Sequence, residues 1–381
     1  MPNILESINR LLTPVKPLSS GIYHYQAPPD AALPYRLHLR LEPDGTGILI
    51  VNASAILHLN QTASEYAYHM IVQTSEEKMV REMTGRYRVK RQQALLDYQM
   101  LRERIQTLIT TPDLDPETFL DFERTSPYTQ EISAPYRLDC ALTYRLSDSM
   151  DNSFAPMKRV ERELTTVEWF GVFDKAWTYG IPHIVLTGGE PTLRNDLTEL
   201  IAHIESNGQV VGLLSDGLKL ADDDYLQSLL QTGLDHMMMT LNPSDEISWK
   251  ALEKVIAADL YLSVHHTLTL QNAMNSTQVL ERLMKMGVKS ISLSASDPGL
   301  QNSLIQTRNQ AASFGLTLVW DLPVPYSSFN PVALETQVDN LPAGSGHAWL
   351  YIEPDGDVLR VQGVNQVLGN ILRDPWEKLW R

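Results

Sequence analysis

Cysteine is almost absent from this chain of 381 residues, because Cys140 is the only one. A single thiol cannot form a disulfide within the chain. It also cannot supply the several thiolates that zinc or iron–sulfur sites take from one polypeptide. Cys140 lies inside the apolar run YRLDCALTY, where a free cysteine behaves as a small hydrophobic residue. We therefore predict a buried, structural role for Cys140.

Long hydrophobic runs are absent as well. No window of about 18 apolar residues occurs, which is the length that a membrane-spanning helix needs. The start, MPNILESINRLLTP, lacks the basic segment and the continuous apolar core of a secretory signal. These absences predict a cytoplasmic protein without a membrane partner.

Basic residues are too few to balance the acidic ones. The chain has 31 Lys and Arg against 46 Asp and Glu, a formal net charge of −15, and such a charge repels phosphate backbones. The one basic cluster is Arg86, Arg88, Lys90 and Arg91, which is typical of a solvated helix flank. We expect no nucleic-acid partner.

Composition and periodicity divide the chain into four segments. The stretch TTPDLDPETF combines two prolines with acidic residues and indicates a linker. Together with a softer boundary at LPVPYSSFNP, it predicts a domain at 1–112, a linker at 113–132, a second domain at 133–325 and an extension at 326–381.

The first segment has the pattern of a small winged-helix domain of α+β type. Alternating residues around a Pro-Asp-Gly turn predict one hairpin over 35–60. Three helical stretches follow. The first is predicted to start at a Thr62 cap with Glu65 completing a capping box, and the second at Ser75.

The second segment alternates short apolar runs with amphipathic stretches. From HIVLTGG onward, the runs recur about every 25–30 residues, which is the length of one βα unit. This pattern predicts an α/β fold with a parallel sheet, in the form of a partial (β/α)6 barrel whose chemistry lies at the carboxyl ends of the strands. AWLYIEPDGDVLRV, residues 348–361, predicts a second hairpin in the extension.

A glycine-rich turn follows the second of these strands. It reads Thr187-Gly188-Gly189-Glu190-Pro191, and the proline suits the first position of a helix. Glycines let a backbone pass close to a ligand, while the carboxylate and the backbone carbonyls can accept hydrogen bonds from an ammonium group. The same segment is also typical of a tight connection with no ligand.

The glycine-rich turn and the first apolar run together resemble motifs of the radical S-adenosylmethionine (radical SAM) superfamily. LTGGEPTLRNDL is similar to the segment that binds the amino end of the methionine moiety, and PYRLDCALTYR is similar to the first barrel strand. The superfamily's next loop holds Cys-x3-Cys-x2-Cys. Here the three positions are Leu146, Met150 and Ser153. The resemblance implies the superfamily's barrel, with its loop length kept and its cluster thiolates replaced.

Later strands extend this resemblance. LLSDG, TGLDHMMMTLN and LSVHHTLTLQN are similar to the third, fourth and fifth strands of the superfamily. The resemblance implies a vestigial S-adenosylmethionine-type site at six positions: Thr187, Gly188, Gly189, Glu190, Ser215 and Asn242.

The two ends of the chain resemble modules that accompany such barrels. The tail from WLYIEPDGDVLRV onward is similar to the SPASM or twitch extension, with Arg360 and Val361 where its Pro-Cys pair would stand. The front segment resembles the RiPP recognition element, which binds leader peptides of ribosomally made, modified peptides (RiPPs). The resemblance implies that a peptide adds as a strand beside the hairpin and leans on the third helix.

The cluster positions decide which chemistry we expect. Leucine cannot ligate iron, a thioether is a weak donor, and a serine hydroxyl is a poor ligand at neutral pH. We therefore expect no [4Fe–4S] cluster, no other metal site, no catalytic residues and at most weak binding of S-adenosylmethionine. No cofactor is expected.

These expectations combine in one hypothesis: a catalytically silent radical SAM-like protein that binds a precursor or leader peptide. It would act as a carrier or scaffold for an active modifying enzyme or homologue. Two alternatives remain open, namely an enzyme that uses S-adenosylmethionine without a cluster for polar chemistry such as methyl transfer, and a winged-helix regulator that binds DNA.

Overall fold

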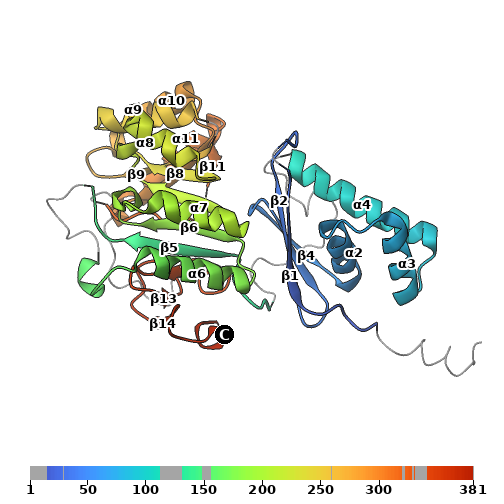
Figure 1. The fold of residues 1–381 in the computed structure, drawn as a ribbon. Coiled ribbons are helices and arrows are strands. Elements are labelled where there is room, and N and C mark those ends of the chain that lie inside the picture. Colours follow the sequence, from blue (N-terminus) through green and yellow to red (C-terminus); the bar gives the residue numbers. More distant parts are fainter. Residues whose placement is uncertain are drawn as a thin grey trace, which may run out of the picture. The chain divides into compact units, whose positions relative to one another are not determined.

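The computed structural model describes residues 15–28, 30–111, 131–147, 156–258, 260–319, 322–327, 330 and 341–380. The chain divides into two compact units, Met1–Ser133 and Ala134–Arg381 (Figure 1). Within the described ranges, no helix is both long enough and apolar enough to cross a bilayer.

The first unit combines an antiparallel sheet of order β1-β2-β3-β4 with helices. Its strands are β1 (Gly21–Gln26), β2 (Arg36–Leu41), β3 (Gly47–Val51) and β4 (Ala55–Leu59). Its helices are α2 (Gln61–Ile71), α3 (Glu76–Arg86) and α4 (Arg91–Thr110). Leucines that alternate along the strands pack against the helices, as the alternating pattern predicts.

The predicted hairpin is only part of this sheet. The segment predicted as one returning strand splits into β3 and β4, because Asn52 and Ala53 both take positive φ, 51° and 54°, and turn the chain. Strand β1, which the hairpin prediction omitted, pairs with β2 on the other side.

Helix α2 begins at a different cap from the predicted one. Asn60 is the N-cap, and its side chain accepts a hydrogen bond from Ala63 N, so the prediction for Thr62 is wrong. Glu65 is buried and accepts hydrogen bonds from Arg86 and from the Tyr87 hydroxyl, at 2.7 and 2.6 Å. Glu65 therefore joins α2 to the end of α3 instead of completing a capping box. The predicted cap of α3 at Ser75 is confirmed.

The second unit is built on a ten-stranded sheet of order β11-β10-β9-β8-β7-β6-β5-β12-β13-β14. Neighbouring strands from β5 to β11 run parallel, which confirms the predicted partial barrel of α/β type. These strands are β5 (Arg137–Thr143), β6 (His183–Gly188), β7 (Val210–Ser215), β8 (His236–Thr240), β9 (Tyr261–Leu268), β10 (Ser290–Ala295) and β11 (Thr317–Leu318).

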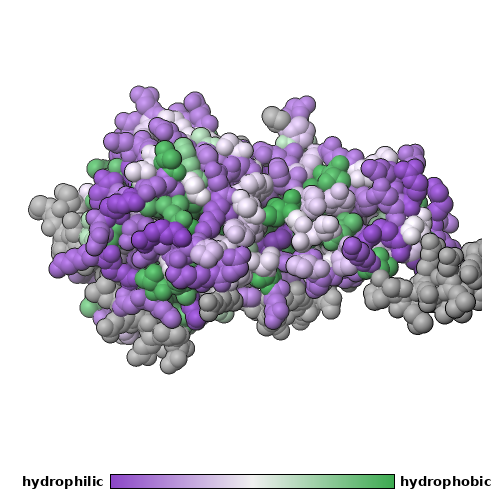
Figure 2. Space-filling view, turned by 60° about the horizontal axis from the view of Figure 1, so that its bottom comes forward, coloured by the Kyte–Doolittle hydropathy of each residue, from purple (hydrophilic) through white to green (hydrophobic). Residues whose placement is uncertain are grey.

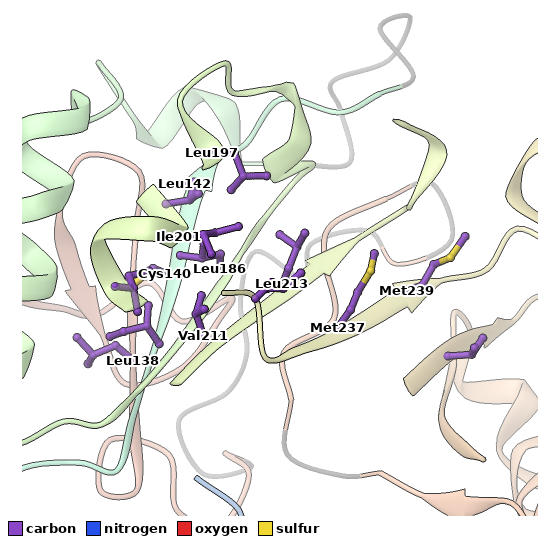
Figure 3. Close-up of a cluster of buried hydrophobic side chains, with 14 of the residues drawn as sticks. Leu138, Cys140, Leu142, Leu186, Leu197, Ile201, Val211, Leu213, Met237 and Met239 are labelled. Carbon is purple, nitrogen blue, oxygen red and sulfur yellow. The ribbon is translucent and has the colours of Figure 1, made fainter. Parts of the chain in front are cut away.

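Helices cover one face of this sheet (Figure 1). They are α6 (Thr166–Thr178), α7 (Leu197–Asn207), α8 (Asp223–Leu230), α9 (Glu246–Ile256), α10 (Ser276–Met286), α11 (Gln301–Ser313) and the short α12 (Trp376–Leu379). Between helices and sheet lies the main hydrophobic core, in which Cys140 sits with Leu138 and Leu142 (Figure 3). The predicted buried role of Cys140 is confirmed.

The predicted second hairpin forms β12 (Trp349–Ile352) and β13 (Asp357–Leu359), followed by β14 (Val367–Asn370). Strand β12 lies parallel beside β5, so the extension continues the barrel sheet past its first strand. The sequence pattern predicted the hairpin but not the pairing of β12 with β5.

The surface carries hydrophobic residues in small, separate groups among hydrophilic ones on the face drawn in Figure 2. Scattered exposed apolar side chains are ordinary for a folded protein.

Candidate functional site

The glycine-rich turn at the end of β6 packs against the chain that leaves β5. Gly188 has a φ of 121°, and a Cβ there would lie 2.2 Å from Thr143 O; a Cβ on Gly189 would lie 2.2 Å from Arg145 O. Gly189 N donates to Thr143 O at 2.8 Å. Any side chain at these two positions would clash with the backbone that leaves β5, so the fold itself requires both glycines.

Glu190 lies at the centre of the polar contacts near this turn. Its Oε1 accepts hydrogen bonds from Thr192 N at 2.9 Å and from Ser215 Oγ at 2.8 Å, and its Oε2 accepts one from Asp216 N at 2.7 Å. The side chain is buried. Burial, followed by the neighbouring Asp216 carboxylate, raises the pKa of Glu190 to about 8. Neutral Glu190 is therefore well populated near neutral pH.

The structure joins some of the six predicted positions by direct contact, while another has a local structural role. Glu190 and Ser215 are hydrogen-bonded, and Thr187 lies next to the glycines. Thr187 is fully buried, and its Oγ1 has no hydrogen-bond partner. Asn242, in contrast, accepts a hydrogen bond from Ser244 N and organises the turn before α9. Thr187, Glu190 and Ser215 thus form the centre of the candidate site.

The predicted cluster positions lie in the loop that follows β5. Leu146 packs against a cluster of buried tyrosines, Tyr144, Tyr326 and Tyr351, on the face of the sheet opposite the main core. Met150 and Ser153 lie outside the described residues. Leu146 therefore contributes an aliphatic contact to the base of this loop.

The tyrosine cluster contains a buried carboxylate that sequence reasoning missed. Tyr144 donates to Glu353 Oε1 at 2.9 Å, and Arg159 donates to Glu353 Oε2 at 2.9 Å. Burial raises the pKa of Glu353 against the opposing effect of Arg159. Because Tyr144 and Glu353 are far apart in sequence, no local pattern could have joined them.

Uncharged polar side chains line β9 and β10 on the face away from the helices. His265 Nδ1 lies 3.0 Å from Ser292 Oγ, and its Nε2 lies 3.0 Å from both Thr267 Oγ1 and Ser294 Oγ. Burial, with a smaller effect of His266, lowers the pKa of His265 to about 3, so its ring is neutral. Sequence reasoning did not select these hydroxyls. The alternation of polar residues in SVHHTL and SISLSA was the available signal.

Known proteins with related sequences match parts of the chain. Residues 140–269 match the family model described as the Radical SAM superfamily. The PqqA peptide cyclase of Methylocella silvestris is 27% identical over 179 residues, which are 43% of this chain and 48% of the relative. That of Granulibacter bethesdensis is 27% identical over 172 residues, 41% of this chain and 46% of the relative. The chain spans about half the length of these curated relatives.

Solved structures extend the similarity across both units. Streptococcus suis SuiB has a TM-score of 0.58 at 13% identity, covering 90% of this chain and 86% of SuiB. The chain has the radical SAM fold. SuiB bound to its precursor peptide SuiA gives a TM-score of 0.59 at 14% identity with the same coverage, and SuiB bound to S-adenosylmethionine gives 0.58 at 14% identity.

The expectation that the chain has no cofactor is therefore wrong. The radical SAM match covers its central strands, and a solved structure of this fold holds S-adenosylmethionine. Radical SAM homologues use S-adenosylmethionine and a [4Fe–4S] cluster. One cysteine is compatible with loss of the cluster but does not establish it.

The described residues fit S-adenosylmethionine better than they fit a [4Fe–4S] cluster. Cys140 is fully buried in the core on the helix side, and burial raises the pKa of its thiol. Leu146 offers no donor atom, so the described part of the loop does not fit a cluster held by three thiolates of this chain. S-adenosylmethionine fits better, because Thr187 has an unused buried hydroxyl and Glu190, three residues later on the same turn, has a buried carboxyl group.

Proposed function

We propose that this chain binds a precursor peptide in the modification of a ribosomally made peptide. The observation that carries the proposal is the combination of the two units: a small sheet-and-helix unit precedes a radical SAM fold, and the same combination gives the similarity to SuiB with its bound SuiA. We propose the segment 1–112 as a winged-helix, leader-peptide-binding domain, 133–325 as the barrel, and 326–381 as a SPASM- or twitch-like extension.

The first unit offers two features for a peptide. Among the described residues, strand β4 is an edge strand that pairs with β3 alone, so its outer edge can accept a further strand. Helix α4 exposes Leu96 and Met100, one turn apart, with 46% and 51% of their surface accessible. An extended peptide that pairs with β4 and packs its own apolar side chains against α4 would use both features.

We propose a carrier or scaffold role for the second unit. Leu146, at the base of the loop after β5, packs on tyrosines instead of offering a ligand. A scaffold of this kind would present the bound peptide to an active modifying enzyme or homologue.

If a precursor peptide packs on α4, replacing the exposed apolar side chains of this helix should weaken peptide binding. Replacing Leu96 and Met100 together with serine is expected to raise the Kd for the precursor peptide about tenfold or more, because two apolar contacts are lost. The measurement is fluorescence anisotropy of the full chain with labelled peptides made from the short reading frames beside its gene. The control is Met284→Ser on α10, which removes a methionine of the second unit that is also exposed, to 40% of its surface. Equal affinities for both variants, or binding of none of the peptides, would contradict the proposal.

A second proposal concerns S-adenosylmethionine, favoured by the orphaned hydroxyl of Thr187. We propose that Thr187, Gly188, Gly189, Glu190 and Ser215 bind its methionine end, with Glu190 near the ammonium group. Bound there, S-adenosylmethionine would supply an electrophilic methyl group for polar chemistry. Glu190 and Thr187 would orient the ligand.

Calorimetry of the full chain with S-adenosylmethionine tests this site. The Thr187→Val variant keeps the side-chain shape and is expected to weaken binding about threefold to tenfold, since one hydrogen bond is lost. Thr178→Val, on the exposed end of α6, is the matched control and should bind as the wild type does. No heat at millimolar ligand, or equal Kd values for Thr187→Val and the wild type, would remove the proposal.

A further inference from the structure

Two histidines meet at the amino ends of β6 and β8. His183 is the first residue of β6, His236 is the first residue of β8, and their Nε2 atoms lie 2.7 Å apart. The ring centroids are 5.0 Å apart. Strand β7 runs between the two strands, so the side chains meet across it.

A glycine on the intervening strand makes this contact possible. Gly212 pairs with His236 in the parallel register. A Cβ on Gly212 would lie 2.2 Å from His236 Cε1 and 2.4 Å from its Nε2. Any side chain at position 212 would therefore push the His236 ring away from His183. Neighbouring Met237 points into the main core, so His236 lies on the other face of the sheet.

The protonation of the pair is set by its contact and burial. A hydrogen bond between two ring nitrogens needs one N–H and one lone pair, so one Nε2 donates to the other. Burial, with a smaller effect of Arg137, lowers the pKa of His236 to about 4, so this ring is neutral at neutral pH. A neutral imidazole nitrogen is a good metal ligand.

We propose that His183 and His236 form a two-histidine site for a divalent transition metal ion of tetragonal preference, Ni2+ or Cu2+. Two nitrogens at right angles, each about 2.0 Å from a metal, lie about 2.8 Å apart. The observed 2.7 Å needs an opening of only about 0.1 Å to reach that spacing. The donating ring moves its proton from Nε2 to Nδ1, and both Nε2 lone pairs then face the metal.

Nearby charges are compatible with a cation. Arg137 donates two hydrogen bonds to Asp139, at 2.7 and 3.1 Å, so its charge is compensated. Asp235 Oδ2, next to His236 in sequence, accepts a hydrogen bond from Val211 N. Within the described ranges, no group of three or more His, Cys, Asp or Glu side chains converges. Water would fill the remaining positions, which makes the site exchangeable.

Thermal unfolding of the tag-free full chain in Ni2+ tests the site. At a Ni2+ concentration about 100-fold above the Kd, the Tm of the wild type should rise by about 5 °C. The His183→Gln variant should lose the rise. The matched control is His203→Gln: His203 is a partly exposed histidine paired with Asp174 at 2.7 Å, and its loss should leave the rise unchanged. No rise in the wild type, or an equal rise in His183→Gln, overturns the proposal.

Cu2+ gives a second measurement that does not depend on stability. The electron paramagnetic resonance spectrum of the wild type with one equivalent of Cu2+ should show coupling to two imidazole nitrogens. His183→Gln, with a far-ultraviolet circular dichroism spectrum like that of the wild type, should lose this two-nitrogen pattern. Retention of the pattern in that variant would place the copper elsewhere and overturn the proposal.

Discussion

The free energy of unfolding of the wild type is expected to fall by about 5 kcal/mol between about pH 4.5 and pH 8, and the Glu190→Gln variant is expected not to show this fall. Burial and the Asp216 carboxylate raise the pKa of Glu190 to about 8. In this window the folded chain therefore holds a proton that the unfolded chain has released. The free energy of unfolding then falls as the pH rises, and the fall is complete above about pH 8.

Urea unfolding of the second unit at a series of pH values measures this effect. The quantity to compare is the difference in unfolding free energy between wild type and variant, because other groups titrate equally in both. Glu199→Gln, an exposed change on α7, is the control and should follow the wild type at every pH. Parallel curves for the wild type and Glu190→Gln would mean that Glu190 is not the buried acid inferred here.

The same carboxyl links stability to ligand binding. The ammonium group of S-adenosylmethionine near Glu190 would favour the ionised form and lower its pKa. If the ligand occupies this site, its affinity should therefore increase as the pH rises toward about 8.

Replacing His266 with leucine is expected to stabilise the second unit by about 1–3 kcal/mol at pH 7. His266 is fully buried, and neither ring nitrogen has a hydrogen-bond partner. Leucine fills a similar volume without a polar atom, and its neighbours on that face, Val264 and Leu268, belong to the main hydrophobic core. The substitution removes an unpaired polar group and adds an apolar contact.

The stabilisation of the second unit by His266→Leu should increase by about 3 kcal/mol as the pH falls to about 4. Burial lowers the pKa of His266 to about 4. Between about pH 6.5 and pH 4 the unfolded chain therefore binds more protons than the folded chain, and the wild type loses stability as the pH falls. Leucine cannot bind a proton, so the variant escapes this loss.

His265→Leu is the matched control for this prediction. His265 is the adjacent residue on β9 but lies on the opposite face, where Ser292, Thr267 and Ser294 surround its ring nitrogens. Leucine there leaves these hydroxyls without their partner and should destabilise the unit at pH 7. Chemical unfolding of the three proteins at pH 7 and pH 5 measures both effects. A destabilised His266→Leu variant would show that the ring has a partner after all.

Local patterns were sufficient to predict most of the barrel. The spacing of apolar runs depends on residues close in sequence, and it placed the strands from β5 to β11. The glycine turn and the second hairpin were also local features. The start of α2 was misplaced by two residues, since Asn60 and Thr62 are both good caps and only the course of β4 decides between them.

The sequence by itself determined the order of strands and helices in the barrel, the scarcity of thiolates and the residues that follow each barrel strand. Only the tertiary structure decided which of these residues meet. Glu190 with Ser215, His183 with His236, and Tyr144 with Glu353 are contacts between separate segments of the chain. Their distances follow from strand order and register, and their pKa values from burial. Both are properties of the packed sheet that no short stretch of sequence contains.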